Sequence, residues 1–183
     1  MQPMTPPLTL ATLNDCPPDA FVAALAEIWE HAPWVPESVV QQRPFASPAA
    51  LHGAMVAVVA ALDEPARVAF YAGHPELAGA DTRRGTMTDD SVAEQGTLAL
   101  ANLDAAAAQR WDTLNKAYRT RFGFPFILCI RRHTRESALR AFEQRLQNDR
   151  ATELAAALDE IAAITRLRLD QRLAPVSIPT PLA

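Results

Sequence analysis

Proline is distributed very unevenly along this chain, and its distribution limits where helices can form. The chain has 183 residues and 15 prolines, but only Pro75 and Pro125 fall within residues 67–174. A proline inside a helix removes a backbone hydrogen bond and clashes with the preceding turn. The proline-poor stretch therefore favours helices. Residues 1–18 are expected to form an extended lead-in, and residues 174–183 a proline-rich tail that is not helical.

Apolar residues recur at helical spacing through most of the chain. The first such helix holds a stripe from Phe21 to Trp29 and is expected to stop at Pro33 and Pro36. The starts or ends of further helices are marked by Ser47-Pro48, Gly73, Ser91, Asp104, Thr134 and Leu173. Residues 122–130 are apolar and aromatic without helical rhythm, which predicts extended, buried backbone. We predict an all-α, single-domain bundle of about seven to nine helices with one short extended apolar segment.

The composition excludes several classes of function. A net charge of -4 argues against a general nucleic-acid binder, which needs a basic surplus. The longest apolar stretch, residues 54–62, is too short to span a membrane, and no targeting segment is recognisable. The two cysteines, Cys16 and Cys129, show neither a disulfide framework nor zinc spacing, which favours a reducing, cytoplasmic location. The four histidines lack ligand spacing, so no metal site is expected.

The segment from Gly73 to Gly79 places a histidine at a rigid corner. His74 precedes Pro75, and a residue before proline is disfavoured in helical conformation. A histidine just past a helix end lies near carbonyl groups that favour a cation, and it can hold or deliver a proton near neutral pH. The alternative interpretation is a histidine that only caps those carbonyls. The local pattern by itself favours the cap.

Three other places could carry chemistry, and each has a structural alternative. Ser91 and Glu94 fit a capping box, or Glu94 points into a pocket. Arg166 and Arg168 lie on the last helix as surface arginines, or one of them grips a carboxylate. Residues 122–130 have a structural interpretation as part of the hydrophobic core. In the functional interpretation, their backbone N–H groups donate hydrogen bonds to a small polar ligand.

Five short motifs follow one another along the chain. They are Arg43-Pro44-Phe45, His74-Pro75-Glu76-Leu77-Ala78-Gly79, Ser91-x-x-Glu94-Gln95, Leu114-Asn115-x-x-Tyr118-x-x-Arg121-Phe122-Gly123-Phe124-Pro125-Phe126 and Asn148-Asp149. Their order and spacing together are far more specific than any one of them. Taken together, they resemble the OHCU decarboxylases, the family that decarboxylates 2-oxo-4-hydroxy-4-carboxy-5-ureidoimidazoline in urate breakdown. The resemblance extends from Phe21 to about Leu173.

The resemblance implies a decarboxylase that needs no metal or organic cofactor and releases (S)-allantoin from a small urate-derived substrate. It implies catalytic roles for His74, Glu94 and Arg168, although Arg166 fits the same Arg-Leu pattern. Substrate-binding positions are implied at Pro75, Ser91, Gln95, Phe126, Ile127 and Arg168, with backbone amides near Ile127 holding the substrate ring. The family often forms homodimers, so a homodimer without nucleic-acid or membrane partners is expected.

The chain departs from the family pattern at Glu76, where Asp is usual, at Ala80, where Lys is frequent, and at residues 96–100. None of these positions is a proposed catalytic group. A catalytically divergent helical protein that binds a ligand or dimerises is therefore kept as the rival reading, and a histidine-based metal hydrolase as a third.

Overall fold

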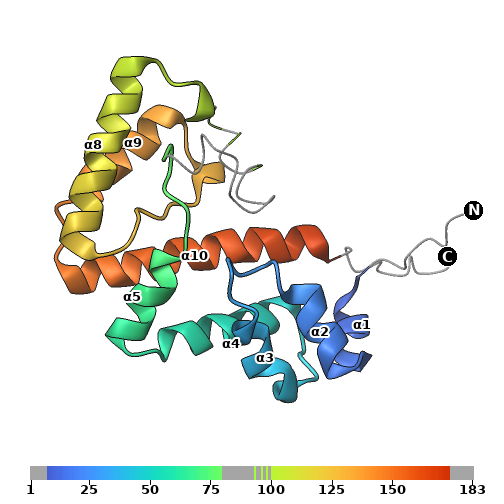
Figure 1. Ribbon diagram of the computed structural model, residues 1–183. Coiled ribbons are helices and arrows are strands. Elements are labelled where there is room, and N and C mark those ends of the chain that lie inside the picture. The colour runs from blue at the N-terminus through green and yellow to red at the C-terminus, as the bar shows by residue number, and fades with distance from the viewer. Residues whose placement is uncertain (1–7, 80–92, 94–95, 97, 99, 174–183) are drawn as a thin grey trace, which may run out of the picture. The chain divides into compact units, whose positions relative to one another are not determined.

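The computed structural model describes residues 8–79, 93, 96, 98 and 100–173 of the chain (Figure 1). In these residues there are eight α-helices, three short 3-10 helices and no β-strand. The predicted all-α class and helix number are therefore confirmed. The chain contacts divide it into two compact units, Met1–Val59 with Thr165–Ala183 and Ala60–Ile164. In the described part, no helix is long and apolar enough to cross a membrane.

The first unit is built from the N-terminal helices and the last turns of α10. Its elements are α1 (Leu10–Asp15), α2 (Pro18–Leu25), α3 (Trp34–Val39), η1 (Val40–Gln42), α4 (Pro48–Ala60) and the end of α10 (Arg150–Arg172). Ser47 caps α4 as predicted, since its hydroxyl accepts a hydrogen bond from the Ala50 N–H at 3.0 Å. The apolar stripe of α4 buries Leu51, Met55 and Val59.

The extended lead-in predicted for residues 1–18 is wrong where the structure describes it, because residues 10–15 are helical. Thr9 and Thr12 form a reciprocal capping box that satisfies the first backbone donors of α1. Pro18 opens α2, where its missing N–H costs nothing. The prolines therefore separate two short helices here and do not prevent them.

The first predicted helix is also shorter than its apolar stripe. It ends at Leu25, and Ile28 and Trp29 lie beyond it in non-helical backbone but remain fully buried. Pro36, expected to stop a helix, lies in the first turn of α3 instead. A proline is tolerated there because the first helical N–H groups have no acceptor within their own helix.

The second unit holds the remaining elements, α5 (Glu64–Ala72), η2 (Leu100–Asn102), α8 (Ala105–Phe122), η3 (Ile130–Arg132), α9 (Arg135–Arg145) and most of α10. The predicted caps Asp104 and Thr134 are confirmed, because each side chain accepts a hydrogen bond from the backbone of the first turn. In Figure 1, α8 and α9 lie side by side, and their contact includes the Trp111 and Phe142 rings, 5.8 Å apart.

The non-helical segment predicted for residues 122–130 is confirmed for residues 124–129, whereas Phe122 is the last residue of α8 and Ile130 the first residue of η3. Gly123 ends α8 in the left-handed region, with φ of 80°, where a side chain would be strained. Phe124, Phe126 and Ile127 are buried without forming a strand. The Phe126 ring stacks on Phe142 with centroids 4.0 Å apart, so this irregular backbone is held by aromatic packing.

Candidate active site

His74 lies just beyond the end of α5, as the sequence predicted. Its backbone N–H donates to the Tyr71 carbonyl oxygen at 3.0 Å, and its ring Nδ1 lies 3.3 Å from the Phe70 carbonyl oxygen. The Phe70 ring meets the imidazole edge-on at 5.1 Å. A carbonyl oxygen can only accept a hydrogen bond, so this contact places the ring proton on Nδ1. In the neutral imidazole, Nε2 then carries the lone pair that can take up a proton.

The turn after His74 is held against α8. The Glu76 carboxylate accepts from Arg119 Nε at 2.8 Å, and the Leu77 carbonyl oxygen accepts from Asn115 Nδ2 at 2.9 Å. At Gly79 an added Cβ would lie 2.6 Å from the Glu76 Cβ, which is closer than real atoms approach. The glycine is therefore required by the tightness of the turn.

The α5 end and the segment after α8 meet in this unit. The Tyr71 ring, three residues before His74, packs edge-on against Phe124 with centroids 5.1 Å apart. Further along, Ile127 and Leu128 are each 4% exposed. Neither backbone N–H has an acceptor among the residues that the structure describes. Buried N–H groups are nearly always paired, which singles these two out as candidate donors to a ligand.

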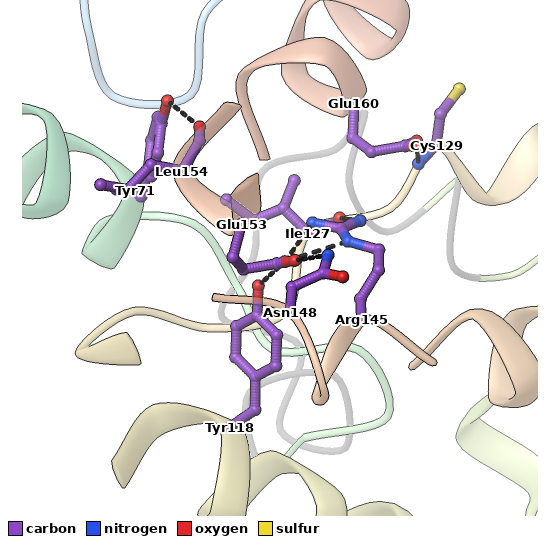
Figure 2. Close-up of polar contacts among 9 residues, drawn as sticks. All are labelled: Tyr71, Tyr118, Ile127, Cys129, Arg145, Asn148, Glu153, Leu154 and Glu160. Carbon is purple, nitrogen blue, oxygen red and sulfur yellow. Dashed lines mark hydrogen bonds and ion pairs between the residues drawn. The ribbon is translucent and has the colours of Figure 1, made fainter. Parts of the chain in front are cut away.

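A buried carboxylate anchors the same region (Figure 2). Glu153 on α10 is fully buried and accepts hydrogen bonds from the Tyr118 hydroxyl, from Arg145 Nε and Nη2 at 3.0 and 2.6 Å, and from Asn148 Nδ2 at 2.8 Å. Burial and the Glu153 contact raise the pKa of Tyr118 well above its usual range. The donors satisfy a carboxylate that would otherwise be costly to bury.

Arg168 and Arg166 differ sharply in their surroundings within the first unit. The side chain of Arg168 is 5% exposed, and its Nη1 lies 3.0 Å from Oε2 of the equally buried Glu30. Arg166 is paired with Asp170 one turn further along, at 2.9 Å, and its side chain is 36% exposed. Of the two arginines, Arg168 is thus the buried one. Its contact with substrate stays a prediction.

The other predicted site residues differ in the compact unit to which they belong and in whether the structure describes them. Pro75, Phe126 and Ile127 belong to the same compact unit as His74, whereas Arg168 belongs to the other. Ser91, Glu94 and Gln95 lie outside the described residues, so their predicted roles are untested. The described residues contain no group of three or more potential metal ligands.

Several polar residues were not singled out from the sequence. Glu30 lies in the first unit, and Arg145, Glu153 and Glu160 lie in the second. Glu153 falls in the first turn of a helix, where an acidic residue ordinarily complements the helix dipole at the surface. Its partners come from separate elements, so no local pattern reveals its burial.

Comparison with known proteins decides the family. The sequence model of the OHCU decarboxylase family matches residues 14–170. This chain belongs to that family. The 2-oxo-4-hydroxy-4-carboxy-5-ureidoimidazoline decarboxylase of Haloferax volcanii is 37% identical over 165 residues, which cover 90% of this chain and 96% of the relative. The mouse protein of the same name is 37% identical over 153 residues, covering 84% and 86% of the two chains.

Two solved structures share the fold. The crystal structure of (S)-allantoin synthase superposes with a TM-score of 0.72 at 26% identity, covering 91% of this chain and 54% of that one. An OHCU decarboxylase crystallised in the presence of (S)-allantoin superposes with a TM-score of 0.58 over 84% of this chain. At 19% identity, the second match supports the fold alone.

Proposed function

We propose that this chain decarboxylates 2-oxo-4-hydroxy-4-carboxy-5-ureidoimidazoline and releases carbon dioxide and (S)-allantoin in urate breakdown. The observation that carries the proposal is the near full-length match to relatives that bear the name of this activity. The histidine of the family signature also lies just past the end of α5, with its Nδ1 3.3 Å from the Phe70 carbonyl oxygen.

The chemistry follows from the substrate. The bond between ring carbon C4 and its carboxylate breaks, and the electron pair forms a C4=C5 double bond. The electrons of the former C5=N1 bond pass through N1 into the conjugated C2 carbonyl, whose oxygen becomes negative. Fixed N–H donors that stabilise this oxygen lower the barrier. The C4 hydroxyl then loses its proton as C4 becomes a carbonyl, and C5, the carbon that bears the ureido group, takes a proton on one face, which sets the (S) configuration of the product. Because the substrate carbonyl accepts the electron pair, the reaction needs no cofactor.

Each step has a proposed residue. Nε2 of His74 orients the leaving carboxylate and supports protonation of the carbon. The N–H groups of Ile127 and Leu128 donate to the developing oxygen, with Pro75 and Phe126 beside the substrate. Glu94 is proposed to bind the hydroxyl or ring N–H groups of the substrate and to polarise His74. Ser91 and Gln95 are proposed to bind the polar edge of the substrate. The role of Arg168, to hold an oxygen-rich edge, rests on the family resemblance.

The test uses the unstable substrate made in place from urate by urate oxidase and hydroxyisourate hydrolase. Adding this protein should speed the loss of the intermediate's absorbance and give optically active allantoin. Racemic allantoin formed at the spontaneous rate contradicts the proposal. The rival reading, a helical binding protein without turnover, predicts instead that (S)-allantoin raises the melting temperature while the rate stays spontaneous.

We also propose that the protein acts as a cytoplasmic homodimer. The homodimer follows from the family resemblance, and both cysteines are free thiols, which suits a reducing compartment. Sedimentation equilibrium at several concentrations tests the first point. Fractionation of cells that express the tagged protein tests the second.

A further inference from the structure

The backbone of residues 127–129 is held by charged side chains from two helices. Arg145 on α9 donates from Nη1 to the Ile127 carbonyl oxygen at 2.7 Å. Glu160 on α10 accepts from the Cys129 N–H at 2.7 Å. Figure 2 shows both contacts beside the buried Glu153. These contacts fix two consecutive peptide groups, one by its carbonyl oxygen and the next by its N–H.

The geometry of the peptide group links these contacts to the Leu128 N–H. The bond between Ile127 and Leu128 is trans, so its carbonyl oxygen and its N–H point in opposite directions within one plane. An arginine that holds the oxygen therefore sets the direction of the N–H. A charged donor on the oxygen also polarises the peptide group and strengthens its N–H as a donor.

Arg145 is itself firmly held, which makes it suitable for this purpose. Two of its nitrogens donate to the fully buried Glu153, and its guanidinium lies 4.7 Å from the centre of the Phe126 ring. Its side chain is 12% exposed. A planar guanidinium with several donors can satisfy the Glu153 carboxylate and the Ile127 carbonyl at once, whereas a lysine cannot reproduce both.

We propose that Arg145 and Glu160 are positioning residues that orient the Leu128 N–H toward the oxygen that becomes negative during decarboxylation. This inference rests on the proposed function. Neither residue touches the substrate. Arg145 fixes the peptide that carries the Leu128 N–H, and Glu160 prevents the following peptide from rotating. Orientation matters because a donor displaced by about 1 Å can lose on the order of a hundredfold in rate.

The experiment centres on Glu160, because replacing Arg145 leaves Glu153 buried with fewer donors and endangers folding. Glu160→Ala removes the acceptor, whereas Glu160→Gln retains a side-chain oxygen that can still accept from the Cys129 N–H. Glu136→Ala on α9 is the matched control, since that glutamate is 81% exposed. For each variant, kcat and KM are measured with the substrate made in place, and folding is checked by circular dichroism and melting temperature.

Glu160→Ala is expected to lower kcat at least about tenfold, with a smaller change in KM, because the charge on the oxygen develops in the transition state. Glu160→Gln should recover most of the rate, and Glu136→Ala should match the wild type. Full activity in a folded Glu160→Ala variant overturns the proposal. So does an equal loss in Glu160→Gln and Glu160→Ala.

A second readout separates this inference from the proposed function. Hydrogen–deuterium exchange of peptides covering residues 124–132 should be faster in Glu160→Ala than in the wild type, with α8 unchanged. Unchanged exchange overturns the positioning role, whatever the activity. If the wild-type protein does not accelerate decarboxylation, the proposed function is wrong. The catalytic role proposed for Arg145 and Glu160 is then wrong as well.

Discussion

The side-chain amide of Asn115 donates a hydrogen bond to the Leu77 carbonyl oxygen at 2.9 Å. Asn115 is 4% exposed and lies on α8, whereas Leu77 lies in the turn that begins at His74. This hydrogen bond joins two residues that are 38 positions apart in the sequence and belong to two different motifs. The asparagine of the second motif thus has a structural purpose, which is to hold the turn that carries the proposed proton-handling histidine.

Asn115→Ala is therefore expected to destabilise the fold by about 1–3 kcal/mol, because it leaves a buried carbonyl oxygen without its donor. Urea denaturation measures this change. Asn102→Ala, at an exposed position, should shift the free energy of unfolding by less than about 0.5 kcal/mol. Equal stability of the two variants would show that the bond contributes nothing.

Gly79 and Gly53 form a second matched pair. An alanine at position 79 brings Cβ within 2.6 Å of the Glu76 Cβ, so Gly79→Ala should cost about 1–3 kcal/mol of stability. Gly53 lies inside α4 with nothing within 4 Å of an added Cβ. Gly53→Ala should therefore stabilise by about 0.5–1 kcal/mol, since alanine favours helices. Melting temperatures that move in the same direction for both variants contradict this account.

The parts of the fold that could be predicted from sequence are those fixed by near neighbours. Asp104 and Thr134 were recognised as helix caps because the acceptor and its N–H donors lie within three residues of each other. His74 was placed correctly at a helix end for the same reason. The lead-in was predicted wrongly because proline content says where a helix cannot continue, not whether a short one fits between prolines.

The candidate site was predicted less completely because its polar residues act across long distances in sequence. Glu153 binds Tyr118 from 35 positions away, and Glu160 binds the Cys129 backbone from 31. Contacts between residues so far apart in sequence leave no helical or strand periodicity by which they could be recognised. The pairing of Glu30 with Arg168 spans 138 positions, so a local pattern could not show which of two neighbouring arginines is buried.

The contrast between Arg168 and Arg166 gives the third prediction. Arg168→Lys should lower kcat/KM by at least about tenfold, because a lysine cannot reproduce planar, bidentate recognition of an oxygen-rich edge. Arg166→Lys should change activity less than twofold, since its partner Asp170 is at the surface. Steady-state kinetics on folded proteins decide between them. A larger loss at Arg166 would mean that the family arginine was assigned to the wrong position.

Both tyrosines of the chain should resist ionisation, which gives a prediction on alkaline stability. Burial raises the pKa of Tyr71 from 10.0 to about 12, and that of Tyr118 rises further still. The folded state therefore holds protons that the unfolded state releases above pH 10, so stability falls as the pH rises from 10 to about 12.

Ultraviolet titration of tyrosinate checks this directly, because the chain has no other tyrosine. At pH 10 the folded protein should show little tyrosinate, whereas the urea-unfolded protein should be about half ionised. Tyr71→Phe should reduce the loss of stability between pH 10 and about 12. Equal titration of folded and unfolded protein would contradict the assigned burial.

His74 gives the prediction on which the proposed chemistry most depends. In His74→Asn the side-chain amide can occupy the place of Nδ1 and still donate to the Phe70 carbonyl oxygen, but nothing replaces Nε2. The variant should therefore fold with a melting temperature near that of the wild type and lose about 10²–10⁴-fold in kcat. His74→Ala removes both nitrogens and serves as the comparison. If the histidine were only a helix cap, His74→Asn would keep its activity and His74→Ala would lose stability, so kinetics and melting measured on the same samples distinguish a proton-handling residue from a structural one.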